Sequence, residues 1–206
     1  GRLFKRGDYI YIAGQSHGYV TGDGAYSHEQ WTAALHACYK KLLELFPDLG
    51  IIVKPHPAEG VLKTAYMYED AIASEWRQRI KVVDTEFSNM EGIYESAFVF
   101  SFSPSVFLES LLLDKNAVCV TTAYGDFITG MADAEKEGAF LFKTLRENIC
   151  GDLSEHLDDF LRQNHERLLQ PIIVSEKFIE NYIYKFDGKA SERVADAAVS
   201  MMESAV

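Results

Sequence analysis

The sequence predicts an α/β protein with a Rossmann-like, mostly parallel sheet and helices on both faces. Six short runs of β-branched and aromatic residues alternate with stretches whose apolar residues recur at helical spacing. Such alternation is typical of βαβ units, which place helices over a parallel sheet. We expect one Rossmann-like domain over residues 1–206, with C-terminal helices from about 151 to 206 packing on it.

The first half of the chain predicts three strands and two long helices. Tyr9–Gly14 is rich in aromatic and β-branched residues and stops at a glycine. Ser27 can cap a helix whose apolar face recurs to Phe46, and the turn after it leads into the short strand that ends at Lys54. Apolar spacing predicts a helix over Tyr66–Arg79, followed by a strand at Ile80–Val83.

The second half continues the alternation and ends in helices. Strands are expected at Phe98–Ser101, Ala117–Thr121 and Ala139–Phe142. A helix at Asn89–Ala97 is expected before the first of these strands, and another from Pro104 onward before the second. Beyond residue 148 the chain is expected to be helical, at Leu153–Leu161, Val174–Tyr184 and Ala190–Ser204, with a break around Pro171.

Composition limits the function classes. Apolar residues make up 48% of the 206 residues, which is enough for a sizeable core. The chain has 31 acidic and 20 basic residues, a net charge of −11, which argues against nonspecific binding to nucleic acid or to an anionic membrane. No apolar stretch approaches a membrane span and no signal peptide is present, so we expect a cytoplasmic protein.

Cysteine usage suggests neither disulfides nor a metal site. The three cysteines, Cys38, Cys119 and Cys150, have no paired spacing and are interpreted as structural thiols. The chain begins at Gly1 without a methionine and runs almost directly into a strand, which we interpret as a sign of a piece cut from a longer protein.

The stretch Ile51–Gly60, Ile-Ile-Val-Lys-Pro-His-Pro-Ala-Glu-Gly, is the first candidate site. Pro55 and Pro57 prevent the strand from continuing and leave Lys54 and His56 at its end. Ligands of open α/β sheets bind outside the carboxyl ends of the strands, so the ammonium and the imidazole are well placed for an anionic group such as phosphate. The alternative is that His56 only completes a turn.

The start of the helix after Phe98–Ser101 is the second candidate site. Ser103 is the natural N-cap before Pro104, and free amides near Ser105 can bind an anion or simply be capped. Glu109 lies one turn further along among core residues, so it either accepts hydrogen bonds from a ribose diol or forms a surface ion pair.

The loop from Gln15 to Tyr26 contains three glycines and is expected at the same sheet edge. It lacks the G-x-G-x-x-G spacing of a dinucleotide fingerprint. His17 in this loop is a further ligand candidate, although loop histidines are more often solvated.

Three segments resemble the nucleotide-binding C-terminal half of GT-B transferases that build bacterial surface polymers. They are Lys-Pro-His-Pro after a strand, Ser-x-Ser with a glutamate one turn on, and Asp-Gly-Lys-Ala-Ser-Glu-Arg near the end. The families are the CDP-glycerol glycerophosphotransferases and the CMP-sialic acid and CMP-Kdo transferases. The first strand with its Gly14–Gln15 loop is similar to the opening strand of the sialyltransferase donor domain, which implies that Gly14 and Gln15 contact the donor nucleotide.

The resemblance implies a donor site for a cytidine nucleotide. By position, His56 with Pro57 and Ser103 with Ser105 would bind the donor phosphate, and His56 would be the catalytic group of this half. The implied partners are a nucleotide-activated sugar or glycerol donor, a polysaccharide or lipid-linked acceptor, and a missing N-terminal acceptor domain.

Two departures from these families and two alternatives remain open. Pro104 separates two serines that are adjacent in the families, so either serine is a candidate for the phosphate. The acceptor half, which usually holds the general base, is missing.

A UDP-sugar 2-epimerase shares a closing Asp-Gly-x-Ala-x-x-Arg pattern, and an interaction module without activity would keep only the fold.

The resemblance also implies capsule, teichoic-acid or lipopolysaccharide synthesis, at the inner face of the plasma membrane through other domains or partners. No cofactor is expected besides the nucleotide-activated donor substrate. No divalent metal is expected for donor binding, because no Asp-x-Asp pair follows a strand end and the positive groups already present can serve the phosphate. Asp84 and Asp126 are the nearest candidates against that expectation.

Overall fold

A computed structural model describes residues 4–14, 27–58, 65–84, 86–102, 104–121, 140–143, 157–182 and 187–204. The chain divides into two compact units, Gly1–Ile173 and Val174–Val206. The first unit contains the sheet and the second contains two helices. The prediction that the helices from about residue 151 onward pack on one common domain stays a prediction.

The sheet has six parallel strands in the order β3-β2-β1-β4-β5-β6. Their bounds are β1 Tyr9–Ala13, β2 Gly50–Lys54, β3 Ile80–Val82, β4 Phe98–Ser101, β5 Ala117–Thr121 and β6 Phe140–Lys143. The chain runs outward from β1 to β3 and then returns to place β4 on the other side of β1. The Rossmann-like fold class predicted from the sequence is confirmed, and the crevice for a ligand is expected where the order reverses, beside β1 and β4.

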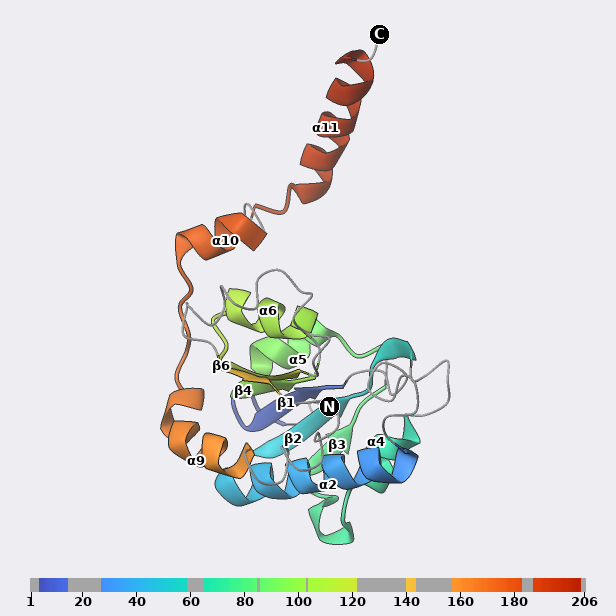
Figure 1. The fold of residues 1–206 in the computed structure, drawn as a ribbon, viewed down its shortest axis with the longest axis vertical. Helices are drawn as coiled ribbons and strands as arrows, with labels where there is room; N and C mark the ends of the chain where they lie inside the picture. Colours follow the sequence, from blue (N-terminus) through green and yellow to red (C-terminus); the bar gives the residue numbers. More distant parts are fainter. Residues whose placement is uncertain are drawn as a thin grey trace. The chain divides into compact units, whose positions relative to one another are not determined.

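Helices cover both faces of this sheet (Figure 1). One face carries α2 (His28–Leu45), α4 (Tyr66–Asp70) and α9 (Leu157–Leu168), and the other carries α5 (Asn89–Glu95) and α6 (Pro104–Leu112). Side chains alternate along β1, so Ile10 and Ile12 join the core beneath α2 while Tyr9 and Tyr11 reach toward α5. Both faces are therefore buried, as parallel sheets require.

The long helix α2 forms as the sequence predicts. Ser27 accepts a hydrogen bond from the Gln30 amide, and the Gln30 side chain accepts one from the Ser27 amide, which completes a capping box. The predicted apolar face is buried, with Trp31, Leu35, Tyr39 and Leu42 all fully enclosed. This face forms much of the core on its side of the sheet.

The predicted helix over Tyr66–Arg79 is wrong in its length. It comprises the five-residue α4 and a separate 3₁₀ turn, η2, at Ser74–Trp76. Ala73 between them has an extended backbone, with ψ 150°, and beyond it the Trp76 ring packs on His36 at 4.8 Å between centroids. Tertiary packing of Trp76 thus prevails over a local helical pattern.

The helix expected at Leu153–Leu161 also differs, since the described part of α9 continues to Leu168. Its carboxyl end is held by Asn116, a 4% exposed residue just before β5. Asn116 Nδ2 donates to the carbonyl oxygens of Arg167 at 2.7 Å and Gln170 at 2.6 Å. Arg167 lies in the last turn of α9 and Gln170 just beyond it, so the two bonds attach the end of this helix to the start of β5.

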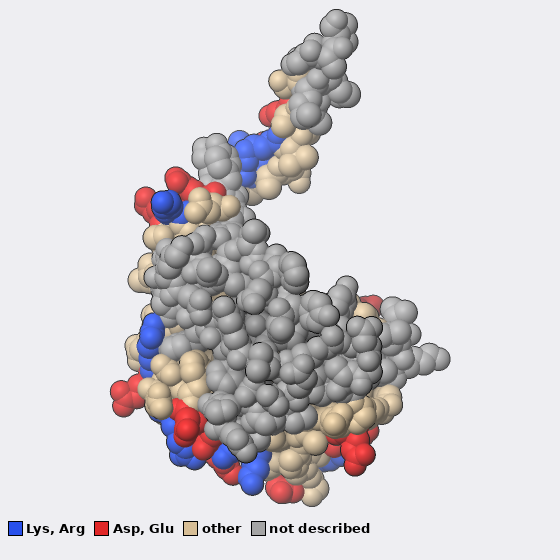
Figure 2. All heavy atoms as spheres, viewed as in Figure 1, with Lys and Arg blue, Asp and Glu red and all other residues tan. Residues whose placement is uncertain are grey.

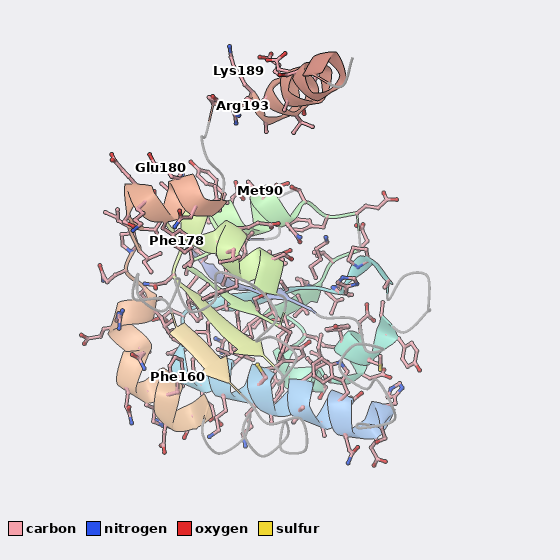
Figure 3. All side chains as sticks on the ribbon, turned by 45° about the horizontal axis from the view of Figure 1, so that its top comes forward. Met90, Phe160, Phe178, Glu180, Lys189 and Arg193 are labelled. Carbon is pink, nitrogen blue, oxygen red and sulfur yellow. The ribbon has the colours of Figure 1, made fainter. Side chains whose placement is uncertain are left out.

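The second unit contains α10 (Glu176–Tyr182) and α11 (Ala190–Ser204), labelled in Figure 3 at Glu180 and Arg193. Asp187 accepts hydrogen bonds from Arg193 Nη1, at 2.7 Å to each carboxylate oxygen, and from the Lys189 amide at 2.9 Å. The Arg193 hydrogen bond is the main cause that lowers the pKa of Asp187. The Asp-Gly-Lys-Ala-Ser-Glu-Arg segment therefore has a local role, which is to fix the start of α11.

Charges of both signs alternate on the described surface of the first unit. Figure 2 shows Lys and Arg beside Asp and Glu at its lower edge, where α2 and α9 lie. Lys41 lies between Glu44 and Asp158, and Arg162 pairs with Asp158 at 3.1 Å. In the part of the chain that the structure describes, no helix is long and apolar enough to cross a membrane.

Candidate functional site

The candidate site lies at the carboxyl edge of the sheet, at the reversal of strand order. Ala13 of β1 is in register with both Lys54 of β2 and Ser101 of β4, so these three strand ends are level. Gly14, the Pro55–Pro57 turn and the start of α6 follow directly from these ends. The structure thus brings the two sequence-predicted motifs to one edge.

His56 caps a turn through Nδ1, and among the described residues no hydrogen bond occupies its other ring nitrogen. Pro57 and Ala58 have helical backbone, and the Ala58 amide donates to His56 Nδ1 at 3.2 Å. In the neutral imidazole the proton must then reside on Nε2, which makes Nε2 a donor. The half-buried ring therefore combines the turn role with a directed N–H group, and Pro57 beside it is exposed.

Lys54 is buried, with 7% of its surface exposed. Its Nζ donates to Asn89 Oδ1 at 3.1 Å, and the same oxygen accepts a hydrogen bond from the Tyr11 hydroxyl at 2.7 Å. Burial lowers the pKa of Lys54, while the charges of Glu109 and Asp84 act in the opposite direction. The ammonium is thus part of a polar cluster beneath the edge of the sheet.

Glu109 is half-buried on α6, and its charge acts on Lys54 and Tyr11 of this cluster. Burial raises the pKa of this carboxyl, and the positive charge of Lys54 opposes the rise. Glu109 also contributes, after burial and Tyr9, to raising the pKa of Tyr11. The Glu109 carboxylate thus acts electrostatically on Lys54 and Tyr11, and no hydrogen bond or ion pair joins it to either of these two described residues.

Gly14 is required by close packing at the end of β1. A Cβ there would lie 2.5 Å from the Tyr68 hydroxyl oxygen and 3.0 Å from the Lys54 carbonyl oxygen. The Gly14 amide donates to that carbonyl at 2.8 Å, which ties the ends of β1 and β2 together. The role of Gly14 in binding a donor stays a prediction.

The remaining predicted site residues divide into two groups. Ser105 is exposed in the first turn of α6, whose amides have no intrahelical acceptor. Gln15, His17 and Ser103 lie outside the described residues, so their assignment to the site stays a prediction.

Asn89 and Tyr11 are members of the cluster that the sequence reasoning missed. Asn89 is the first residue of α5, after the cap Ser88, and no pattern in the sequence distinguishes it from an ordinary helix start. Tyr11 was assigned only to the strand. Its ring fits against α5 because Gly92 has no Cβ, which would otherwise clash with the Tyr11 ring.

Among the described residues, no group of three or more His, Cys, Asp or Glu side chains could hold a metal ion. Asp84, one of the two metal-ligand candidates, is exposed. Its carboxylate accepts hydrogen bonds from the backbone amides of Glu86 at 3.0 Å and Phe87 at 2.9 Å. This carboxylate orders the loop before α5. Asp126 lies outside the described residues.

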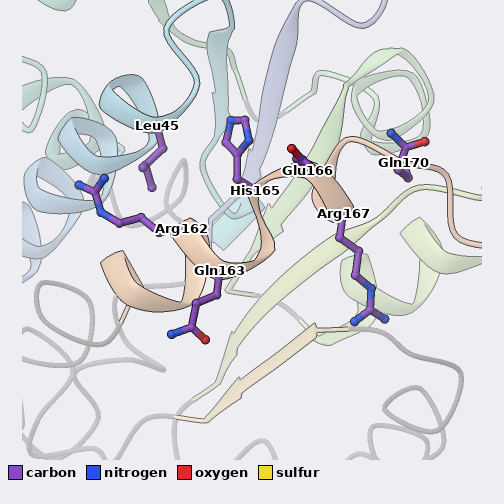
Figure 4. A pocket seen from close by; sticks show the side chains of 7 residues that line it. All are labelled: Leu45, Arg162, Gln163, His165, Glu166, Arg167 and Gln170. Atoms are coloured by element: carbon purple, nitrogen blue, oxygen red, sulfur yellow. The ribbon is translucent and has the colours of Figure 1, made fainter.

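A separate open hollow of about 810 Å³ lies along α9 (Figure 4). Its lining residues are Leu45, Arg162, Gln163, His165, Glu166, Arg167 and Gln170. Leu45 ends the helix before β2, and α9 ends beside Asn116 before β5, so the hollow is at the amino edge of the sheet. We place the site at the opposite edge, because ligands of parallel sheets bind at the carboxyl ends.

The comparisons with known proteins agree with this architecture. No protein-family model and no curated protein matches the sequence. Among solved structures, this chain is similar to UDP-GlcNAc 2-epimerase from Neisseria meningitidis bound to UDP-GlcNAc, with 15% sequence identity and a TM-score of 0.58. The match covers 94% of this chain and 45% of the epimerase chain. The fold of this chain is similar to one half of that GT-B-like structure.

Two further solved structures are similar. UDP-GlcNAc 2-epimerase from Methanocaldococcus jannaschii has 15% identity and a TM-score of 0.52, with 94% of this chain and 46% of that chain covered. The wall teichoic acid polymerase TagF has 16% identity and covers 97% of this chain and 45% of its own, but its TM-score of 0.44 is too low to support an inference. This chain spans about half the length of these structures.

Proposed function

We propose that this chain is the donor-binding half of a transferase that uses a cytidine-activated sugar or glycerol in bacterial surface-polymer synthesis. The observation that supports this most is the arrangement at the reversal of strand order. There, His56 Nε2, the first amides of α6 and the Glu109 carboxylate come from adjacent elements of one edge. Such a set suits a phosphate joined to a ribose.

In the proposed reaction, an acceptor hydroxyl attacks the transferred group and the bond to the nucleotide phosphate breaks. The bonding electron pair leaves on the phosphate oxygen. His56 Nε2–H and the amides near Ser105 stabilise that negative charge, and Lys54 adds positive potential from below. The proton of the attacking hydroxyl is taken by a residue of the acceptor-binding half.

A nucleotide panel in a thermal-shift assay tests this function. A ligand at 100 times its Kd stabilises the folded state by about 2.7 kcal/mol, which corresponds to a rise in Tm of roughly 5 to 10 °C for a chain of this size. We expect CMP and CDP to raise Tm more than UMP, UDP and GDP. No response to any nucleotide at millimolar concentration would favour an interaction module.

The second candidate function is that of a UDP-sugar 2-epimerase half. The observation that favours it is the fold similarity to the N. meningitidis epimerase, whose structure contains UDP-GlcNAc. A larger rise in Tm with UMP and UDP than with the cytidine nucleotides would support this candidate over the first.

Replacing Glu109 by glutamine tests the ribose contact. Two hydrogen bonds from a diol to a carboxylate become weaker with an amide, so we expect CMP binding to weaken by roughly 1.5 to 3 kcal/mol, about 10- to 150-fold. Binding of 2′,3′-dideoxy-CMP should change by less than about threefold, since it lacks both donors. Equal loss for both ligands in calorimetry would mean that the ribose is held elsewhere.

Donor binding should not depend on a divalent metal. We expect the calorimetric Kd for CMP to stay within about twofold when EDTA replaces Mg²⁺, because the imidazole and the helix amides already neutralise the phosphate. A Kd that rises tenfold or more with chelator, and recovers when Mg²⁺ is returned, would contradict this.

A further inference from the structure

The Lys54 ammonium has a single hydrogen-bond partner among the described residues. Lys54 is the last residue of β2, level with Ala13 at the end of β1, and 7% of its surface is exposed. Its Nζ donates to Asn89 Oδ1 at 3.1 Å, and it forms no ion pair with a described carboxylate. An ammonium has three N–H donors, so two of them have no acceptor in the part of the chain that the structure describes.

A positive charge in this enclosed position is costly unless acceptors surround it or a counter-ion neutralises it. The carboxylates of Glu109 and Asp84 act on the charge of Lys54 only from a distance. Lys54 ends its strand at the carboxyl edge of the sheet, where ligands of parallel sheets bind. An anionic ligand at this edge is therefore in a position to supply the missing acceptors.

The side chain of Asn89 is fixed in one orientation. Because an ammonium only donates, the atom of Asn89 that faces Lys54 Nζ must be the oxygen. The Tyr11 hydroxyl lies 2.7 Å from the same oxygen and donates to it. The Tyr11 ring is fully buried and packs against α5 at Gly92, where a Cβ would clash with it. Tyr11 of β1 thus holds the Asn89 carbonyl, and this carbonyl holds the ammonium at the end of β2.

An amide at position 89 has a chemical consequence for Lys54. A carboxylate in its place would form an ion pair with the ammonium and cancel much of its positive charge. The neutral amide oxygen accepts one hydrogen bond and leaves the charge and two N–H groups unused. Asn89 therefore orients the ammonium without neutralising it.

We infer that Asn89 is a positioning residue, which holds the Lys54 ammonium through a neutral acceptor so that the positive charge and the two remaining N–H groups serve an anionic group of the ligand. Tyr11 fixes that acceptor. The inference rests on the proposed function, because the donor phosphate is the anion that this function brings to the edge. It assigns roles to two residues outside the Lys-Pro-His-Pro and Ser-x-Ser motifs.

Asn89→Asp tests this inference with little change of shape. Aspartate is favourable in the first turn of a helix, so we expect the variant to fold and to pair with Lys54. Calorimetry compares CMP with cytidine, which lacks the phosphate. We expect CMP to bind about tenfold more weakly, or weaker still, and cytidine affinity to change by less than about threefold. If Asn89 only holds α5 in place, an ion pair causes no loss, so unchanged CMP affinity would overturn the inference.

Ser88→Asp is the matched control. Ser88 is exposed, forms no hydrogen bond with Lys54, and caps the same helix by accepting the Glu91 amide at 3.3 Å, which aspartate can also accept. This variant adds the same charge one residue away, and we expect CMP affinity to fall by less than about threefold. An equal loss in both variants would show general repulsion of the phosphate and overturn the inference.

The Lys54→Met background supplies a second control. Asn89→Asp should there weaken CMP no more than Ser88→Asp does, because the ammonium that it would neutralise is gone. A further tenfold loss from Asn89→Asp in that background would mean that Asn89 does not act through Lys54.

The ¹⁵N NMR signal of Lys54 Nζ separates this inference from the proposed function. We expect inorganic phosphate at millimolar concentration to shift the signal in the unaltered protein and to shift it much less in Asn89→Asp. If CMP does not bind the unaltered protein, the proposed function fails, while a shift with inorganic phosphate still supports an anion contact at Lys54. A signal that moves with neither CMP nor inorganic phosphate would overturn the inference.

Discussion

Replacing Asn116 by aspartate is expected to lower the free energy of unfolding by about 3 to 5 kcal/mol at pH 7. The Asn116 amide donates to two carbonyl oxygens at the end of α9, at 2.7 and 2.6 Å, and the residue is 4% exposed. A carboxylate of the same shape has no N–H to donate and brings a negative charge against both carbonyls. The substitution thus loses two hydrogen bonds and buries an unpaired charge.

Denaturant unfolding monitored by circular dichroism measures this effect. Asn164→Asp is the matched control, since Asn164 Nδ2 donates to one carbonyl, Phe160 O, within its own helix and is only partly buried. We expect the control to cost at most about 1 kcal/mol. A comparable cost in both variants would show that Asn116 is not the attachment point of α9.

The pH dependence of Asn116→Asp has a predictable direction. Burial raises the folded-state pKa of the new carboxyl above its unfolded value, so its protonated form is favoured in the folded protein. Relative to the unaltered protein, the deficit should be largest above that raised pKa and should shrink as the pH falls toward 4. A deficit that is constant between pH 7 and pH 4 would indicate that lost packing, and not charge, is its cause.

Replacing His56 by alanine is expected to weaken CMP binding by about 1.5 to 3 kcal/mol, roughly 10- to 150-fold, measured by calorimetry. The reason is the loss of the Nε2–H donor to the phosphate. The sequence suggested that this change leaves the fold intact. The structure adds that His56 Nδ1 accepts the Ala58 amide at 3.2 Å, so alanine also removes a cap worth about 0.5 to 2 kcal/mol.

His56→Asn separates the two roles of the histidine. The asparagine Oδ1 occupies a position similar to Nδ1 and can accept the Ala58 amide, but its side chain is too short to reach the place of Nε2. We expect this variant to retain near-normal stability and to lose CMP affinity as much as His56→Ala. Normal affinity in His56→Asn would mean that His56 serves only the turn.

The strands and the helix starts could be predicted from the sequence because their causes are local. The run before Gly14 and the apolar run before Pro55 are short and end at residues that stop a strand. Ser27 caps α2 through a contact only three residues away. The six strands of the sheet were therefore anticipated, and with them the edge that carries His56 and α6.

What only the tertiary structure decided depends on partners far away in the chain. The break after α4 follows the packing of Trp76 on His36, and the carboxyl end of α9 is held by Asn116, 51 and 54 residues from its two acceptors. Lys54 was expected to face the ligand at the end of its strand. Its burial beside Asn89, 35 residues away, arises because α5 folds over β1 and β2, and no local pattern records that contact.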